Sequence, residues 1–156
     1  MAQRIVSPCV GLCSTTVGDS VCRGCQRHDG EILDWLSLTD AERAERMQEL
    51  DALRVAVASR FLRVEDEALL ESQLTRHRIR FRSDQPALSR AVELLRVGRD
   101  RIHDLSRYGL VVIGRDAAHA QDPQALYAAL GAALYDAGEA RRQAQTISPG
   151  SGTLMT

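Results

Sequence analysis

The chain has no lysine and no asparagine, so all twenty of its basic side chains are arginines. Lysine and asparagine codons are AT-rich, and a GC-rich genome is the simplest explanation of both absences. The arginine content is therefore weak evidence of nucleic-acid binding. Aromatic residues are also few, with one Trp, three Tyr and two Phe among 156 residues. The core must consist mainly of Leu, Val, Ile and Ala.

Long apolar runs are missing as well. No stretch approaches the roughly 18 apolar residues that a membrane-spanning helix needs. The opening segment MAQRIVSPC has no apolar run after Arg4, which is unlike a secretory signal. We therefore expect a cytoplasmic protein without a membrane partner, in a compartment where thiols stay reduced. The sequence also has no P-loop, GxGxxG or GxSxG motif, so it gives no reason to expect an enzyme.

Cysteine is absent except between residues 9 and 25, where all four cysteines of the chain occur. Their spacing is C-x3-C-x8-C-x2-C, which is two short-range pairs separated by a loop. Glycines inside both pairs and in the loop permit the tight turns that such a site needs. Four thiolates raise each other's pKa unless a metal neutralises them. The pattern predicts a metal centre with the ligands Cys9, Cys13, Cys22 and Cys25.

The spacing does not identify the metal. A zinc ion and an iron–sulfur cluster both accept four cysteine ligands. The formal charge of the site is near −2 in either case, and Arg23 and Arg27 could offset it. Two disulfides are disfavoured in a reducing compartment. A thioredoxin-like redox pair at Cys22 and Cys25 lacks the βαβ pattern around it. His28 is more simply a capping or exposed residue than a ligand.

The cysteines belong to a wider pattern: Ser7-Pro8-Cys9, Cys13, Cys22-Arg23-Gly24-Cys25 with Arg27, then Trp35 and Asp40-Ala41-Glu42-Arg43. From Ser7 to about Leu50 this pattern resembles a bacterial family, domain of unknown function 1289, whose members are described as predicted iron–sulfur proteins. The resemblance implies that the four cysteines are cluster ligands. It implies no substrate or reaction, and it does not extend over residues 63–156.

The rest of the chain is predicted to be helical. Apolar residues at three- and four-residue steps indicate helices over residues 40–62, 65–77 and 86–108. A short helix capped by Asp29 should hold Trp35, and a last helix should begin at Asp122. Thr39 and Glu42 have the spacing of a capping box. The segment 110–114, LVVIG, is a short strand or coil with no obvious pairing partner.

The predicted fold is mainly α, with a small four-cysteine metal-binding module packed on a helical body. We place the module at residues 1–37, the body at residues 38–144, and a disordered tail at residues 145–156, where Ser, Gly, Thr and Pro are frequent. We expect Trp35 to pack with Ile32 and Met47 as a lid over one side of the module.

The charges are unevenly distributed. Residues 31–72 carry five Arg and eleven acidic residues, for a net charge of −6, and residues 73–107 carry nine Arg and four acidic residues, for +5. A basic face that binds nucleic-acid phosphates is one interpretation. Pairing with the acidic segment is the one we favour. The basic residues concerned are Arg76, Arg78, Arg80 and Arg82.

Two functional hypotheses follow from these patterns. The first is an iron–sulfur protein with an electron-transfer, sensing or accessory role. The second is a structural zinc module that presents a helical, partly basic surface to a protein or RNA partner. A protein partner that the sequence does not identify is expected in both.

Overall fold

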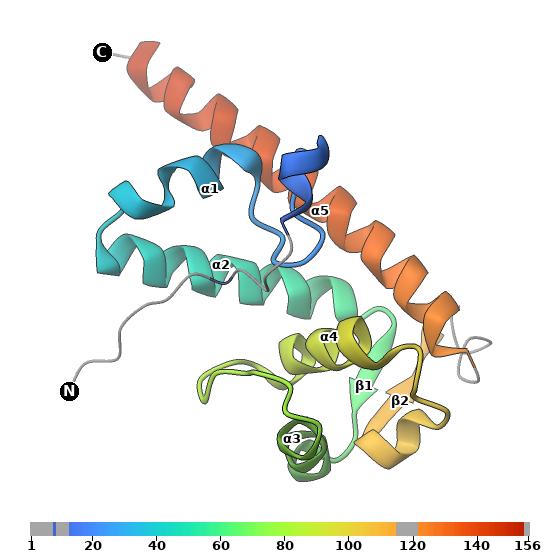
Figure 1. Ribbon diagram of the computed structural model, residues 1–156. Helices are drawn as coiled ribbons and strands as arrows, with labels where there is room; N and C mark the ends of the chain where they lie inside the picture. Colours follow the sequence, from blue (N-terminus) through green and yellow to red (C-terminus); the bar gives the residue numbers. More distant parts are fainter. Residues whose placement is uncertain (1–7, 9–12, 115–121, 155–156) are drawn as a thin grey trace. The chain divides into compact units, whose positions relative to one another are not determined.

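The computed structural model describes residues 8, 13–114 and 122–154, with side chains up to Gln145. Figure 1 shows that the chain is mainly helical, as the sequence predicts. It divides into two compact units, one formed by Met1–Leu50 with Ala133–Thr156 and the other by Asp51–Ala132. These boundaries differ from those predicted at residues 37 and 144. No helix in the described part of the chain has the length and apolar character needed to cross a membrane.

The first unit contains short helices and parts of two long ones. These are η1 (Ser14–Val17), α1 (Asp29–Asp34), η2 (Trp35–Ser37), the first part of α2 (Asp40–Ala58) and the second part of α5 (Pro123–Leu154). The predicted capping box of α2 is confirmed, because Glu42 N–H donates to Thr39 Oγ1 at 3.1 Å and Thr39 N–H donates to Glu42 Oε1 at 2.9 Å. The cap predicted for α1 is wrong by one residue. His28 Nδ1 accepts from Glu31 N–H, which leaves Asp29 inside the helix.

The second unit has a two-stranded sheet that the sequence analysis did not predict. Helix α2 ends at Ala58 and not near Leu62, because residues 62–64 leave the helix to form β1 (Leu62–Val64). This strand pairs antiparallel with β2 (Leu110–Val112), with Leu62 opposite Val112. The segment 110–114 thus has a pairing partner. That partner, β1, lies where periodicity predicted the end of one helix and the link to the next.

The helix predicted over residues 86–108 is too long. Helix α3 (Glu67–Arg76) is close to its predicted range, but α4 (Ala87–Gly98) ends at the glycine that interrupts the pattern. Glycine lowers helix stability by about 1 kcal/mol relative to alanine, and the chain turns there. A separate 3-10 helix, η3 (Leu105–Tyr108), begins after Asp104, whose carboxylate accepts from Ser106 N–H at 3.0 Å.

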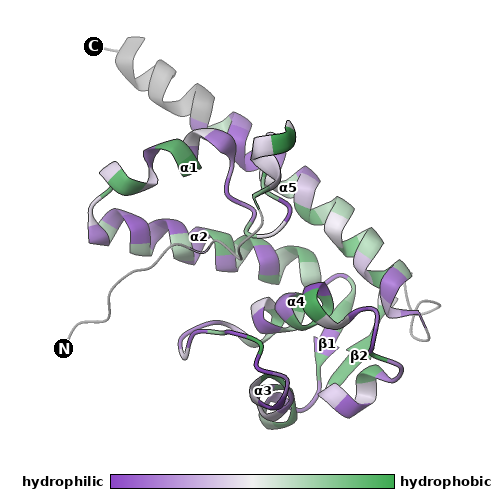
Figure 2. Cartoon of the chain, viewed as in Figure 1, coloured by the Kyte–Doolittle hydropathy of each residue, from purple (hydrophilic) through white to green (hydrophobic). Residues whose placement is uncertain are grey.

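Helix α5 begins where the sequence predicts. Asp122 Oδ1 accepts from Ala125 N–H at 3.1 Å. Its buried face includes Leu126, Leu130 and Leu134, also as predicted. Apolar and polar residues alternate along this helix in Figure 2. The backbone remains helical to Leu154, through most of the segment for which composition predicts a disordered tail.

Candidate metal centre

Cys22 and Cys25 lie at the tip of a short hairpin. An isolated antiparallel bridge between Val21 and His28 joins its two arms. Cys22 N–H donates to Arg27 C=O, and Gln26 N–H donates to Cys22 C=O, both at 2.8 Å. Gln26 has a φ of 65°, in the left-handed region that L-residues rarely adopt. The hairpin thus curls the chain tightly around the two sulfurs.

The two sulfurs are buried and share a hydrogen bond. Each cysteine is only 1% exposed. The bond from Cys25 lowers the pKa of Cys22 to about 4, helped by the backbone N–H groups of Cys25, Ser14 and Gly24. The same bond, together with burial, raises the pKa of Cys25. The pair therefore holds one proton between two sulfurs and carries one negative charge.

Arg27 is a buried cation beside this pair. It is 4% exposed, and its Nε donates to Cys25 Sγ at 3.4 Å. Its guanidinium lies 4.9 Å from the centre of the Trp35 ring, which is also buried. Among the described residues no carboxylate pairs with Arg27. A buried charge without a counter-charge costs several kcal/mol, so the sulfur pair is the counter-charge of Arg27.

Trp35 covers the side of this pair that Arg27 occupies. Of the predicted lid over the module, the structure shows one contact: the Trp35 ring stacks on Arg27, which bonds Cys25. The predicted packing against Ile32 and Met47 stays a prediction. Arg43 also contacts the tryptophan, because its Nε donates to Trp35 C=O at 2.9 Å.

The other two cysteines are less closely placed. Cys13 is half-buried, and its Sγ lies 2.9 Å from Thr15 Oγ1. Cys9 lies outside the described residues. Within the part of the chain that is described, no three metal-binding side chains come together. The backbone beside Cys13 nevertheless reaches the pair, since Ser14 N–H donates to the Cys22 sulfur and Ser14 Oγ accepts from Arg23 N–H at 2.9 Å.

The donor set fits a metal better than it fits a reactive thiol. A thiol pKa near 4 is typical of nucleophilic cysteines, which must also be reachable by their substrate. At 1% exposure Cys22 has no open approach for a substrate disulfide. Buried sulfurs in mutual contact, surrounded by N–H donors and a guanidinium, are suited to binding a metal as thiolates.

The cysteine hairpin makes contacts with α5 that were not predicted from the sequence. Ser20 Oγ lies 3.1 Å from Tyr135 Oη and donates to Glu139, and Arg23 stacks over the Tyr135 ring at 4.3 Å. Val21 is fully buried and packs against Gly138. More than 110 positions separate these partners, so no local pattern in the sequence indicates them.

A second group of contacts holds α1 to the same helix. Arg142 Nε lies 3.0 Å from Asp29 Oδ1, and this bond holds the pKa of Asp29 below its usual range. His28 Nε2 lies 2.6 Å from Gln145 Oε1. His28 therefore caps one helix and contacts another, and no described metal group includes it.

Arg141 joins α5 to α1 and α2 through two acidic residues. It forms a two-pronged ion pair with Glu31, at 2.7 and 2.5 Å, and it lies 3.0 Å from Glu49 Oε1. The Glu31 side chain is almost completely buried. Removing one member of such a buried network leaves a charge unpaired, which costs about 3–5 kcal/mol. The contact between the cysteine segment and α5 thus provides a substantial part of the stability of the first unit.

Replacing Gly138 by alanine is expected to destabilise the first unit. A Cβ atom there would lie 2.7 Å from Val21 Cγ1, closer than side-chain packing permits. Alanine normally stabilises a helix by about 1 kcal/mol relative to glycine, but we expect a net loss of roughly 1–3 kcal/mol here. Urea unfolding followed by circular dichroism measures it. A control on the same helix, in the part that belongs to the second unit, is Gly131→Ala, where the nearest described atom outside the helix backbone is 3.9 Å away. If both variants are stabilised, the contact with Val21 is not as described.

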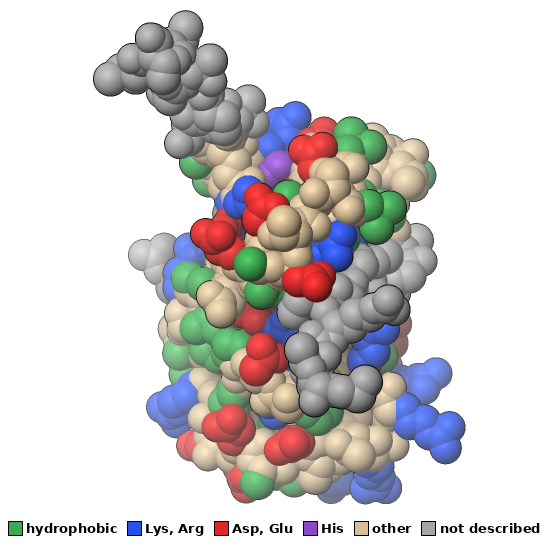
Figure 3. Space-filling model, turned by 90° about the vertical axis from the view of Figure 1, so that its left-hand side faces the viewer, with side chains coloured by type: hydrophobic (Ala, Val, Ile, Leu, Met, Phe, Trp, Pro, Cys, Tyr) green, Lys and Arg blue, Asp and Glu red, His purple; other side chains and the backbone are tan. Residues whose placement is uncertain are grey.

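The arginines of the basic run do not all have the same surroundings. Arg76, Arg78 and Arg80 are exposed, whereas Arg82 is half-buried and forms an ion pair with Asp51. That ion pair joins the basic run to the acidic segment, which is the arrangement that the sequence analysis favoured. Figure 3 shows acidic and basic side chains interspersed on one face of the molecule. Nucleic-acid binding stays a prediction.

No curated protein and no solved structure matches the chain. A family model does match, over an amino-terminal segment that includes all four cysteines and Trp35 and ends within α2. Residues 7–54 match the family described as protein of unknown function (DUF1289), which is the family that the cysteine pattern resembles.

Proposed function

We propose that Cys9, Cys13, Cys22 and Cys25 hold an iron–sulfur cluster and that the protein serves in electron transfer, in sensing or as an accessory protein. The observation that carries the proposal is the buried guanidinium of Arg27 bonded to Cys25 Sγ. A cation in that position requires negative charge on the sulfurs. A metal centre with four thiolates supplies a lasting formal charge near −2, whereas the Cys22 and Cys25 pair that shares one proton supplies −1.

The chain's own residues have distinct roles in this proposal. The four sulfurs would bind the cluster, which would supply a one-electron redox centre. The backbone N–H groups that point at the Cys22 sulfur would offset the charge of the cluster, and so would the guanidinium of Arg27. Such outer contacts tune a metal site and fix its ligands. Trp35, which is buried and stacks on the Arg27 guanidinium, would exclude water from that side of the cluster.

One observation supports a second candidate, a structural zinc site. The hydrogen bond between Cys22 and Cys25 brings their sulfurs together. Two thiolates that bind the same tetrahedral ion at about 2.3 Å lie roughly 3.8 Å apart. Zinc accepts such a pair, and so does one iron of a [2Fe–2S] cluster, whereas each iron of a [4Fe–4S] cluster takes a single cysteine. We therefore expect zinc or [2Fe–2S] before [4Fe–4S].

The proposal requires Cys13 to change its partner. Its sulfur now contacts the Thr15 hydroxyl, within two residues of it in the sequence. A rotation about the Cα–Cβ bond moves a sulfur by a few ångströms without moving the backbone. The hydrogen bond from Ser14 N–H to the Cys22 sulfur supports this change, because it brings the backbone next to Cys13 close to the pair.

Anaerobic purification of the full chain tests the proposal and separates the two metals. An iron–sulfur protein is expected to be brown, to absorb in the visible range and to contain equal amounts of iron and acid-labile sulfide. A colourless protein with about one zinc per chain supports the second candidate and rejects the first. A folded, reduced protein without stoichiometric metal, under growth with added iron and with added zinc, rejects both.

Arg27→Gln is expected to weaken metal retention. Replacing a residue that bonds a metal ligand typically costs 10–100-fold in metal affinity. We expect the metal to pass to a chelator at least tenfold faster than from the wild type, for zinc and iron alike. The matched control is Arg23→Gln, because Arg23 lies between the same two cysteines but its side chain is 58% exposed. Equal release rates for the two variants would contradict the role given to Arg27.

A further inference from the structure

The arginines of the two units differ in their partners. In the first unit, every described arginine except the buried Arg27 forms an ion pair with a carboxylate. These arginines are Arg23, Arg43, Arg46, Arg141 and Arg142. The exposed arginines of residues 73–107, in the second unit, form no ion pair with any described residue. They are Arg76, Arg78, Arg80, Arg101 and Arg107. A GC-rich genome raises the arginine content of both units alike, so composition does not explain this difference.

Helices α3 and η3 bring part of this group together beside two aromatic rings. The two helices pack against each other, and Gln73 Nε2 donates to Arg107 C=O at 3.3 Å. The ring centres of His77 and Tyr108 lie 6.1 Å apart, within the range of an aromatic pair. His77 is exposed and Tyr108 is half-buried. We call this region the α3–η3 surface, and its residues are Arg76, His77, Arg78, Arg107 and Tyr108.

The carboxylates near the α3–η3 surface serve as helix caps. Asp66 Oδ1 accepts from Leu69 N–H at 3.0 Å, where α3 begins. Asp104 Oδ1 accepts from the Ser106 hydroxyl at 2.6 Å and from Ser106 N–H at 3.0 Å. These two bonds lower the pKa of Asp104, and the charge of Arg107 lowers it less. The surface therefore keeps positive charge that an anion can use.

Arg78 occupies a backbone position that favours glycine. Helix α3 ends in a Schellman motif, in which Ile79 N–H donates to Leu74 C=O at 2.9 Å and Arg78 N–H donates to Thr75 C=O at 3.1 Å. The φ of Arg78 is 58°, in the left-handed region. Glycine is the usual residue there because it has no Cβ atom. The backbone turn alone would favour glycine, so the arginine indicates a use of its side chain.

We propose that the α3–η3 surface binds single-stranded nucleic acid. Arg76, Arg78 and Arg107 would contact phosphates, and a base would stack on the Tyr108 ring. A duplex read by a recognition helix fits less well. Such a helix enters the groove with its amino-terminal residues, and α3 begins with acidic side chains that phosphates would repel. An acidic peptide would pair with the arginines but would make no use of the ring. The proposal does not depend on a metal.

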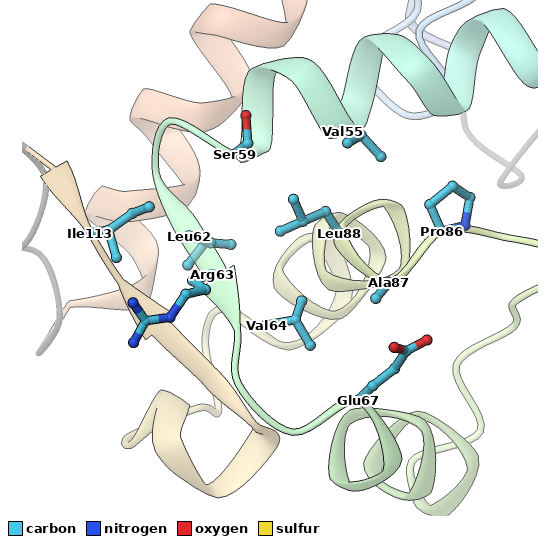
Figure 4. Close-up of a pocket in the computed structure, with 10 residues that line it drawn as sticks. All are labelled: Val55, Ser59, Leu62, Arg63, Val64, Glu67, Pro86, Ala87, Leu88 and Ile113. Atoms are coloured by element: carbon cyan, nitrogen blue, oxygen red, sulfur yellow. The ribbon is translucent and has the colours of Figure 1, made fainter.

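The groove beside β1 is a different feature of the second unit. Figure 4 shows this space, of about 500 Å³, with mainly apolar residues around it, among them Val55, Leu62 and Leu88. Arg63 also borders it, and this arginine pairs with Glu65 at 3.1 Å. Arg63 is exposed and belongs to the same unit as the α3–η3 surface. It therefore provides a matched control for the loss of one positive charge.

Fluorescence anisotropy of labelled oligouridine and oligothymidine, each about twelve nucleotides long, tests the proposal with the full chain. The logarithm of the affinity should fall with the logarithm of salt concentration, with a slope of about −2 for three phosphate contacts. Arg78→Gly should reduce this slope by about 0.7 and weaken binding about fivefold at low salt. The same variant should be at least as stable as the wild type in urea, because glycine suits the left-handed position. Arg63→Gln should bind like the wild type.

Tyr108 separates base stacking from simple attraction between charges. Tyr108→Ala should weaken binding about fivefold or more, whereas Tyr108→Phe keeps the ring and should bind like the wild type. An abasic strand of the same length should bind the wild type and Tyr108→Ala equally. Binding of polyglutamate or of a duplex as tightly as the single strands would overturn the proposal. So would an absence of salt-dependent binding, or an equal loss of affinity in Arg63→Gln and Arg78→Gly.

Discussion

Replacing Cys22 by serine is expected to remove the proposed metal centre and to release the first unit from its folded state. Cys22 accepts hydrogen bonds from the backbone N–H groups of Cys25, Ser14 and Gly24 and shares a proton with Cys25, so negative charge on this pair is strongly stabilised. A serine hydroxyl is not deprotonated there and is a poor ligand for zinc or iron. We expect metal content to fall below roughly a tenth of the wild-type value. Metal analysis and visible absorption of the purified variant measure it.

The same substitution should also affect helix α5. The free energy of metal binding to a structural site, about 10–16 kcal/mol for zinc, is also folding free energy. The hairpin that carries Cys22 holds Tyr135, Gly138 and Glu139. Loss of the metal should therefore accelerate amide exchange over residues 133–145 and over residues 20–31. Residues 51–132 form a separate compact unit, whose exchange should change little.

Thr15→Val is the control for the metal measurement. This variant removes the hydroxyl that contacts Cys13 but changes no candidate ligand. It should keep its full metal content, because the proposal already requires Cys13 to leave Thr15. A Cys22→Ser protein that retains stoichiometric metal, with unchanged exchange in residues 20–31, would contradict the assignment of Cys22 as a ligand.

Gly109→Ala is expected to destabilise the second unit strongly. Gly109 has a φ of 76°, and a Cβ atom there would lie 2.2 Å from the backbone oxygen of Asp66. Its own carbonyl accepts from the N–H groups of Glu65 and Asp66, which fixes the two segments in contact. The strained φ costs about 1–3 kcal/mol and the clash a further 1–3 kcal/mol. The sum, roughly 2–6 kcal/mol, is a large part of the 5–15 kcal/mol that stabilises a typical domain.

Urea unfolding of the full chain measures this loss, and Gly18→Ala separates its two causes. Gly18 also has a positive φ, of 109°, but a Cβ atom there has no described neighbour within 4 Å. Gly18→Ala should show the cost of the backbone conformation alone. If Gly109→Ala costs no more than this control, the close approach of Gly109 to Asp66 does not limit stability.

Local patterns in the sequence predicted the parts of the fold that depend on neighbouring residues. Thr39 and Glu42 cap α2 because a capping box involves only four consecutive positions. Asp122 starts α5 for the same kind of reason. The pairing of Cys22 with Cys25 follows from a spacing of three residues, which one turn closes. These signals are local, so a single sequence contains them completely.

Predictions failed where a distant segment decides the local structure. The periodic pattern of α2 continues toward Leu62, yet the chain leaves the helix because Leu62–Val64 pair with Leu110–Val112, almost fifty positions away. The pattern of α4 likewise continues beyond Gly98, although the helix ends there. Helix and strand propensities of such short apolar runs differ by less than the free energy of a tertiary contact.

By itself, the sequence determined that this protein is mainly helical, that its thiols gather near the amino terminus, and where two of its helices begin. Only the tertiary structure decided that the second part of α5 packs on the cysteine hairpin, that Arg27 is the buried cation beside Cys25, and that β1 lies at the bottom of a groove. The physical reason is that burial and charge pairing depend on which segments meet in space. That choice is a property of the whole chain's packing and of no single stretch within it.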